Sequence, residues 1–213
     1  MSPRKSDSRQ RMVRSTVKLL REYGANATSI DRVLAHSGAP RGSVYHHFPA
    51  GRTQLIEEAI ALAGSTMAGV IESAMQAEDP VEAIDAFFTH WRNRLAENAF
   101  RTGCPIVAVA VETNDEAPQL AHAAGDVFAG WQGAFQALFR RHGLAEDRCR
   151  SLAALIVAAE EGAVVMCRAQ QSSAPMEAVA KEVHSLLVHA LKPEPAKDQP
   201  RNEDTAKRNL KKP

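Results

Sequence analysis

The chain contains few of the residues that build disulfide, zinc and enzyme sites. It has only three cysteines, at positions 104, 149 and 167, and no C-x-x-C pair. Three cysteines cannot all pair, so the sequence predicts a reduced, cytoplasmic protein. The G-x-S-x-G, P-loop and dinucleotide-binding glycine motifs are absent, as is the spacing of zinc ligands. We therefore expect no enzyme, no catalytic residue, no cofactor and no metal site.

Long apolar runs and strand signals are also missing. No segment approaches 18 consecutive apolar residues, and the N-terminal residues are basic and polar. We therefore expect no membrane-spanning helix, no signal peptide and no membrane partner. The chain has only two Tyr and no run in which apolar and polar residues alternate. The fold class that this pattern predicts is all-α.

Charge is distributed unevenly along the chain. Residues 1–52 hold ten Lys and Arg against three Asp and Glu, which gives +7. Residues 53–192 hold ten against eighteen, which gives −8. The net charge of +1 therefore hides a basic head on an acidic body. This asymmetry is typical of a protein whose head binds nucleic acid, although a basic face without a partner is the alternative when charge is considered alone.

Residues 24–52 carry the most informative pattern, because they contain two short helical stretches separated by a turn. Thr28 is expected to cap the first helix through its hydroxyl, in a capping-box pattern with Asp31. Gly38 can adopt the left-handed conformation that a tight turn requires, and Pro40 suits the first position of the second helix. This is the layout of a helix-turn-helix, whose second helix fits the DNA major groove.

The second helix, over residues 40–47, begins with groups that can bind DNA. Arg41 can donate two hydrogen bonds to a guanine or pair with a phosphate. Gly42 lets the backbone approach the groove, and Ser43 can donate or accept at a base or a phosphate. Tyr45 offers its hydroxyl to the phosphate backbone. The adjacent histidines His46-His47 point in different directions on a helix, so they are expected to face solvent or phosphate rather than a metal.

Residues 8–55 resemble the DNA-binding domain of the TetR family of transcriptional regulators, whose Tyr-x-His-Phe motif appears here as Tyr45 to Phe48. The resemblance implies a first helix over about 8–23 and a long helix over about 52–77 that leads to a ligand domain. It implies a double-stranded DNA operator as partner. It also implies that six residues match positions that contact DNA: Thr28, Arg41, Ser43, Tyr45, His46 and Arg52. Ala39 departs from the Ser or Thr cap of many members.

The segments Pro49–Leu55, Gly103-Cys104-Pro105 and Ala108-Val109-Ala110 resemble the LmrA/YxaF branch of that family. Members of this branch repress multidrug-efflux genes and release DNA when they bind small, often aromatic, compounds. The resemblance implies a repressor that a small effector releases from a palindromic operator. A DNA-binding regulator without a small-molecule ligand is the alternative.

Helical periodicity continues after residue 52, and the breaks contain proline or glycine. The expected helices cover about 52–77, 80–98, 105–113, 118–142, 146–170 and 175–191. With three earlier helices they make nine. We expect a helix-turn-helix domain over 1–51, a ligand-binding and dimerisation domain over 52–192, and a disordered tail over 193–213, which has four prolines and one leucine.

Large aromatic residues are concentrated in residues 80–142, at helical spacing. Such stripes usually belong to a core, but a small-molecule site is also an apolar cavity with a few polar groups. The expected ligand-binding residues are Phe87, Trp91, Phe128, Trp131, Phe135 and Met166. Glu160 and Glu161 interrupt an apolar helix, so one of them is expected to face solvent and the other a cavity or a dimer partner.

The helices at about 146–170 and 175–191 carry wide apolar stripes, which in a monomer would face only their own core. The resemblance implies that these two helices build a homodimer interface. A dimer also suits a palindromic operator, because the two recognition helices then face two half-sites.

Cys104 precedes Pro105 at an expected helix start, where the helix dipole favours a thiolate. A thiol-based sensor acting through Cys104 is therefore an alternative function. A small buried residue in a turn is the other interpretation.

Overall fold

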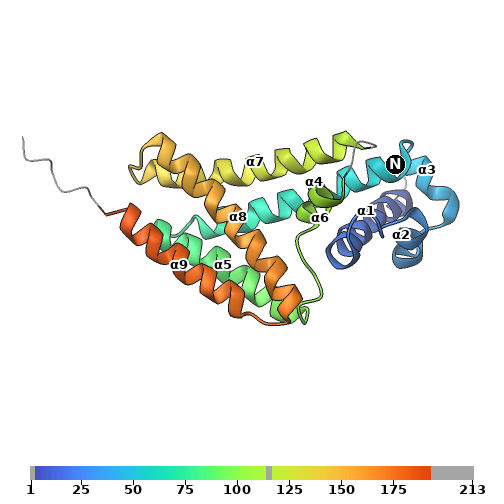
Figure 1. Cartoon of the computed structure of the whole chain (residues 1–213). Coiled ribbons are helices and arrows are strands. Elements are labelled where there is room, and N and C mark those ends of the chain that lie inside the picture. The colour runs from blue at the N-terminus through green and yellow to red at the C-terminus, as the bar shows by residue number, and fades with distance from the viewer. Residues whose placement is uncertain (1–2, 114–116, 193–213) are drawn as a thin grey trace, which may run out of the picture.

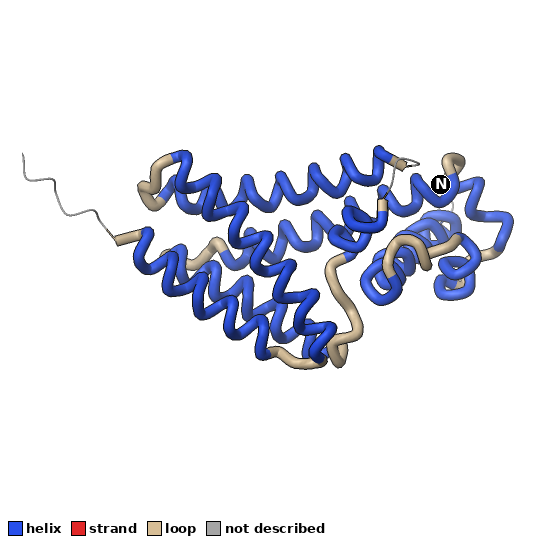
Figure 2. The backbone as a smooth tube through the Cα atoms, in the orientation of Figure 1, coloured by secondary structure: helices blue, strands red, loops and turns tan. Residues whose placement is uncertain are grey.

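The computed structural model describes residues 3–113 and 117–192, with side chains from residue 7 onward. These residues form nine α-helices and one short 3₁₀ turn, and they contain no strand (Figures 1 and 2). The expected all-α fold is thus confirmed for the described part of the chain. The tail over 193–213, for which we predicted disorder, lies outside the described residues.

The N-terminal helices form a small bundle of their own at one end of the molecule (Figure 1). They are α1 (Pro3–Tyr23), α2 (Ile30–Ser37), the 3₁₀ turn η1 (Arg41–Ser43) and α3 (Val44–His47). Apolar side chains from all three α-helices meet beneath the turn: Met12, Leu20, Val33, Val44 and Phe48 are buried. The helix α1 extends five residues further toward the N-terminus than expected.

The helix α4 (Gly51–Ala74) runs from this bundle into the larger helical body (Figure 1). By length and composition it is apolar enough to cross a membrane. Its apolar side chains Leu55, Ile56 and Ile60 are buried, however, and the helix packs against α1 and α7. Nine of its 24 residues are buried, so its apolar residues form part of the core of the protein.

The larger body contains α5 (Pro80–Glu97), α6 (Pro105–Glu112), α7 (Pro118–Arg141), α8 (Glu146–Gln170) and α9 (Ala174–Ala190). The helix α8 crosses the body diagonally and packs against α7 and α9 (Figure 1). The predicted bounds of these helices and of α4 agree with the observed ones to within three residues. Prolines near four of the starts explain this agreement, because proline suits the first turn of a helix.

The predicted cap of the first helix of the motif was wrong by one residue. Ser29 caps α2 and accepts a hydrogen bond from the Arg32 N–H at 3.2 Å. The Thr28 hydroxyl instead donates to the Gly24 carbonyl at 2.6 Å. Thr28 and Ser29 are both good caps, and sequence alone does not reveal which of two adjacent hydroxyls points at the helix end.

Candidate DNA-binding surface and the junction behind it

The turn between α2 and the second helix of the motif has the geometry that its glycine predicts. Gly38 has φ = 67° and ψ = 20°, and its N–H donates to the Leu34 carbonyl at 3.0 Å. This left-handed conformation ends α2 at no steric cost. The second helix begins at Arg41 as a 3₁₀ turn and continues as α3. The expected helix is therefore present over 41–47, in two parts, and Pro40 is the extended residue before it rather than its first residue.

The first turn of that helix points its polar side chains outward. Arg41 is 85% exposed and forms an ion pair with Asp31 on α2 at 3.3 Å. Tyr45 is 66% exposed, and His46 and Gly42 are exposed beside it. Arg41, Gly42, Tyr45 and His46 thus share one accessible surface that is held by buried Val44 and Phe48.

Three residues for which DNA contact was expected, Thr28, Arg52 and Ser43, make contacts within the protein instead. Thr28 is 1% exposed, so its side chain cannot reach DNA from this conformation, and the prediction for Thr28 is corrected. The Arg52 guanidinium donates to the carbonyls of Thr28, at 2.9 Å, and Ala25. Arg52 therefore holds the turn before α2 against the start of α4. The hydroxyl of half-buried Ser43 donates to the Pro40 carbonyl at 2.6 Å.

A set of polar contacts joins the N-terminal bundle to the larger body. The Glu112 carboxylate, at the end of α6, accepts a hydrogen bond from the Asn26 N–H at 2.6 Å. The same carboxylate occupies the space beside Gly24, where a Cβ would lie 2.0 Å from its oxygen. Gly24 also has φ = 84°, which disfavours any other residue. The positive φ therefore favours glycine at this position, whereas the Glu112 oxygen is the end of a flexible side chain that could move aside.

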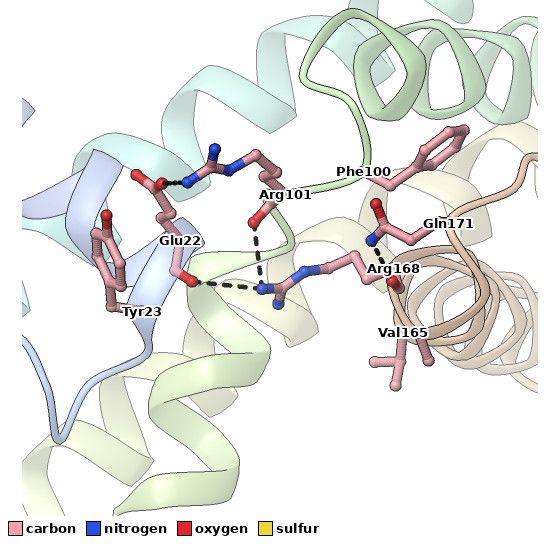
Figure 3. Close-up of a pocket in the computed structure, with 8 residues that line it drawn as sticks. Glu22, Tyr23, Phe100, Arg101, Val165, Arg168 and Gln171 are labelled. Carbon is pink, nitrogen blue, oxygen red and sulfur yellow. Dashed lines mark hydrogen bonds and ion pairs between the residues drawn. The ribbon is translucent and has the colours of Figure 1, made fainter.

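The end of α1 is held by two arginines of the larger body (Figure 3). Arg168 on α8 donates to the carbonyls of Glu22, at 3.4 Å, and Arg101, at 3.3 Å. Arg101 also forms an ion pair with the Glu22 carboxylate at 3.2 Å. The Gly103 N–H donates to the Arg21 carbonyl at 2.9 Å. A displacement of α8 or of the loop before α6 would therefore move α1 directly.

A cavity of about 370 Å³ lies behind these contacts, between the end of α1, α6 and α8. Its apolar lining comes from all three helices and includes Leu20, Val107, Ala108, Val111 and Val164. Its polar lining includes Cys104 and Glu161. The cavity thus adjoins the segments that a change in the larger body would use to reach the N-terminal bundle.

Glu160 and Glu161 are both buried on α8, so the expectation that one faces solvent was wrong. Burial raises the pKa of Glu160 well above its usual range, and the neighbouring Glu161 adds to the rise. Burial raises the pKa of Glu161 to about 7, and the adjacent Cys104 thiol limits that rise. In the described part of the chain, neither carboxyl has an N–H or O–H donor to it. Burial therefore favours the protonated form of both carboxyls, more strongly for Glu160 than for Glu161.

The surroundings of Cys104 disfavour a thiolate. Burial raises the pKa of the Cys104 thiol well above its usual range, and the carboxylates of Glu161 and Glu160 raise it further. This is the opposite of the effect expected from the helix start at Pro105. A redox-sensing cysteine needs an accessible thiolate, so the structure removes the physical basis of the thiol-sensor alternative.

Four of the expected ligand-binding aromatics are buried in the core, and the fifth, Phe128, is partly buried against it. The rings of Phe87 and Phe135 meet edge to face at 5.2 Å, and those of Phe128 and Trp131 at 5.6 Å. The Trp131 indole N–H donates to the Gly64 carbonyl at 3.2 Å. Phe87, Phe135 and Trp91 are almost fully buried. Side-chain packing therefore accounts for this stripe, and none of the five lines the cavity beside Glu161.

Met166 is 42% exposed, which contradicts its expected place in an internal cavity. It lies with Leu155, which is 43% exposed, on an outward face of α8 that also presents Ala154, Ala158 and Gly162. The buried face of α8 carries Leu152, Ile156 and Ala163 instead. The single apolar stripe expected on α8 is therefore two stripes, one in the core and one on the surface.

Sequence reasoning missed the parts played by Glu112 and Arg168, whose partners are backbone groups 86 and 146 residues away. It expected one of Glu160 and Glu161 to face a cavity or a dimer partner without saying which, and Glu161 lines a cavity. The one local signal was the pair of acidic residues within the apolar segment Leu152 to Met166. Such an interruption is costly when buried, and it therefore points to a site more strongly than an aromatic stripe does.

Comparison with known proteins gives two family matches and full-length relatives. Residues 13–59 match the model of bacterial regulatory proteins of the tetR family, and residues 80–182 match the LmrA/YxaF-like transcriptional regulator C-terminal domain. An uncharacterized HTH-type transcriptional regulator of Mycobacterium tuberculosis is 43% identical over 189 residues, which cover 86% of this chain and 95% of that protein. The HTH-type transcriptional regulator LmrA of Bacillus subtilis is 27% identical over 85% of this chain and 97% of its own.

The same fold occurs in a cysteine-substituted variant of the TetR-family regulator CifR, solved with 26 bp double-strand operator DNA. The TM-score is 0.72 at 17% identity, over 83% of this chain and 94% of that one.

Proposed function

The chain belongs to the TetR family of bacterial transcriptional regulators, and from this premise we propose that it is a dimeric repressor that a small effector releases from a palindromic operator. The observation that carries the proposal is the exposed surface of η1 and α3, where Arg41, Tyr45 and His46 face outward from a buried base. The basic head, residues 1–52, supplies the electrostatic attraction to phosphates. Residues 52–192 form the proposed ligand-binding and dimerisation domain.

Arg41 and Gly42 are the proposed base-reading part of the surface, and Tyr45, His46 and Ser43 the proposed phosphate contacts. In the free protein the Ser43 hydroxyl donates to the Pro40 carbonyl, and Arg41 pairs with the exposed carboxylate of Asp31. An exposed ion pair contributes little free energy, so Arg41 can leave Asp31 and bind a DNA group with only a small loss of stability. Arg52 is proposed to act indirectly, because it fixes the turn before α2.

The proposed switch uses the contacts at the junction. An effector that favours a different position of α6 or α8 would shift Glu112 and Arg168, and with them Asn26 and the end of α1. The two recognition helices of a dimer would then no longer match the half-site spacing. The effector can shift the balance only by its differential affinity for the two states, typically about 1–3 kcal/mol of coupling. From the resemblance to the LmrA/YxaF branch, we propose an efflux gene as target and the cytoplasm as location.

The deciding experiment is gel-shift binding of the purified protein to the DNA flanking its own gene, with and without small apolar and aromatic compounds. Specific binding that a compound abolishes supports the full proposal. Specific binding that no compound alters favours the alternative, a DNA-binding regulator without a small-molecule ligand. Absence of specific binding at low salt contradicts the DNA-binding assignment.

Arg41→Ala is expected to weaken operator binding by about 1–3 kcal/mol and to reduce discrimination at one base pair. Arg41 has no packing role that its removal would disturb, since its side chain is largely exposed. The measurement is fluorescence anisotropy on the operator and on single-base variants. Arg140→Ala is the matched control, since Arg140 is also exposed and ion-paired, to Glu146, but lies at the far end of α7. Uniform weakening on every sequence would place Arg41 on a phosphate instead.

Leu155→Arg is expected to disrupt the proposed dimer, because it sets a charge in the middle of the outward apolar face of α8. Sedimentation velocity should then give a species at the chain mass of 23.1 kDa, where the unaltered protein gives twice that mass. Leu62→Arg is the matched control, since Leu62 is similarly exposed on α4. A protein that sediments as a dimer with arginine at position 155 would place the interface elsewhere.

A further inference from the structure

The cavity between α1, α6 and α8 combines apolar walls with one buried acid. Leu20, Val107, Ala108 and Val164 supply most of the apolar lining. The side chain of Glu161 is 7% exposed and lines the cavity from α8. An ionisable group in such surroundings is costly to keep, because burial removes water without supplying a partner.

The other charged groups of the cavity already have partners. The Glu112 carboxylate accepts from the Asn26 N–H, and the Glu22 carboxylate pairs with Arg101. The Arg168 guanidinium donates to two backbone carbonyls. Among the described residues, both oxygens of Glu161 lack a hydrogen-bond partner, and the Cys104 thiol beside it is at most a weak donor. Glu161 is therefore the group in this cavity that has capacity left for a ligand.

We propose that this cavity binds a small, largely apolar molecule carrying one cationic amine, with the Glu161 carboxylate as its counter-charge. The walls would exclude water from an apolar body, and the amine would supply the donors that Glu161 lacks. The lining carries three carboxyls, those of Glu22, Glu112 and Glu161, against one guanidinium, that of Arg168, so its formal charge favours a cation over an anion. The inference rests on the proposed ligand response and deepens it, since it moves the effector site from the aromatic core to the junction.

The position of the site gives such a ligand access to the switch. Bound between α1, α6 and α8, it would touch the segments that carry Glu112 and Arg168, which hold the N-terminal bundle. Binding would also be linked to protons, because the pKa of Glu161 is about 7 and the amine needs the ionised form. Amine affinity is therefore expected to rise as the pH increases from 6 to 8.

Several other titratable and charged groups surround Glu161. They are Glu22 and Tyr23 of α1, Cys104, Glu112 of α6, Glu160 and Arg168 of α8, and Arg94 of α5, which interacts with Cys104.

The test is isothermal titration of the full chain without DNA, using three cage compounds of one shape: 1-adamantylamine, 1-adamantanol and 1-adamantanecarboxylate. The amine is expected to bind at least about tenfold more tightly than the alcohol, and the carboxylate most weakly. In Glu161→Gln the preference for the amine should fall below about threefold. Glu112→Gln is the matched control on the rim and should keep the preference. Titration at pH 6 in two buffers of different ionisation enthalpy should show proton release with the amine and none with the alcohol.

Equal binding of amine and alcohol, binding of none of the three, or a preference that survives Glu161→Gln would each overturn the proposal. Loss of the preference in Glu112→Gln alone would also overturn it, because the counter-charge would then be the rim carboxylate. Ala108→Trp, which fills the cavity and leaves Glu161 in place, should weaken both the amine and the alcohol. The ligand response in the proposed function is tested separately. It fails if the amine binds in the cavity but leaves operator binding unchanged.

Discussion

Phe87→Ala is expected to lower the free energy of unfolding by about 3–5 kcal/mol. Phe87 is 1% exposed and meets Phe88 and Phe135 edge to face, at 5.9 Å and 5.2 Å between ring centroids. Removing the ring takes away its burial and leaves a hole that close-packed neighbours fill only in part. Urea unfolding followed by far-UV circular dichroism measures the change.

This result would distinguish a packed core from a ligand pocket. Phe128→Ala is the control, because Phe128 lies on α7 in the same aromatic region but is only partly buried, and its loss should cost clearly less. A ring that lined an empty pocket would have fewer neighbours to lose. If Phe87→Ala left stability nearly unchanged and abolished effector binding, the stripe would be a binding site after all.

The helix-turn-helix was predictable because its signals are local. Gly38 and Pro40 fix the turn within three residues, and buried Val44 and Phe48 follow from helical spacing. Helix starts over the rest of the chain were predictable for the same reason, since prolines mark them.

Periodicity does not say which partner an apolar face has, and this limited the prediction of the sites. Leu152 and Leu155 are three residues apart on α8, yet the first is buried and the second is exposed. Aromatic spacing likewise fitted a core and a cavity equally well for Phe87. Glu112 finds its partner Asn26 only through the packing of α6 against α1, which no local pattern encodes.

Buried acids were easy to see in the sequence and hard to interpret. A pair of adjacent glutamates on one helix normally points in two directions, so one was expected to reach solvent. The helix α8 packs against α5, α7 and α9, and Cys104 before α6 lies beside the two glutamates, so both are buried. A protein tolerates buried carboxyls by keeping them protonated. Their effect on the free energy of unfolding therefore depends on pH.

Glu161→Gln is therefore expected to raise the free energy of unfolding by about 3 kcal/mol above pH 7, with little effect near pH 4.5. The folded-state pKa of Glu161, about 7, lies above the value of 4.5 for an unperturbed glutamate. The neutral carboxyl suits the folded protein, so stability from this group is complete below pH 4.5. It decreases as the pH rises through 7, because the buried group must then ionise. A glutamine has no such charge, so the gain should appear gradually between pH 4.5 and 7 in urea unfolding.

Glu146→Gln provides the contrast of opposite sign. Hydrogen bonds from Arg140 lower the pKa of Glu146, which is exposed at the start of α8. Its ionised form therefore stabilises the folded protein above the unperturbed pKa, and that contribution is lost as the pH falls. The amide at position 146 should lower stability at pH 8, where the amide at position 161 raises it. A gain from Glu161→Gln that was equal at pH 5 and pH 8 would mean that the carboxyl changes packing rather than charge. The same ionisation that destabilises the folded chain near neutral pH is the one that an amine in the cavity would compensate.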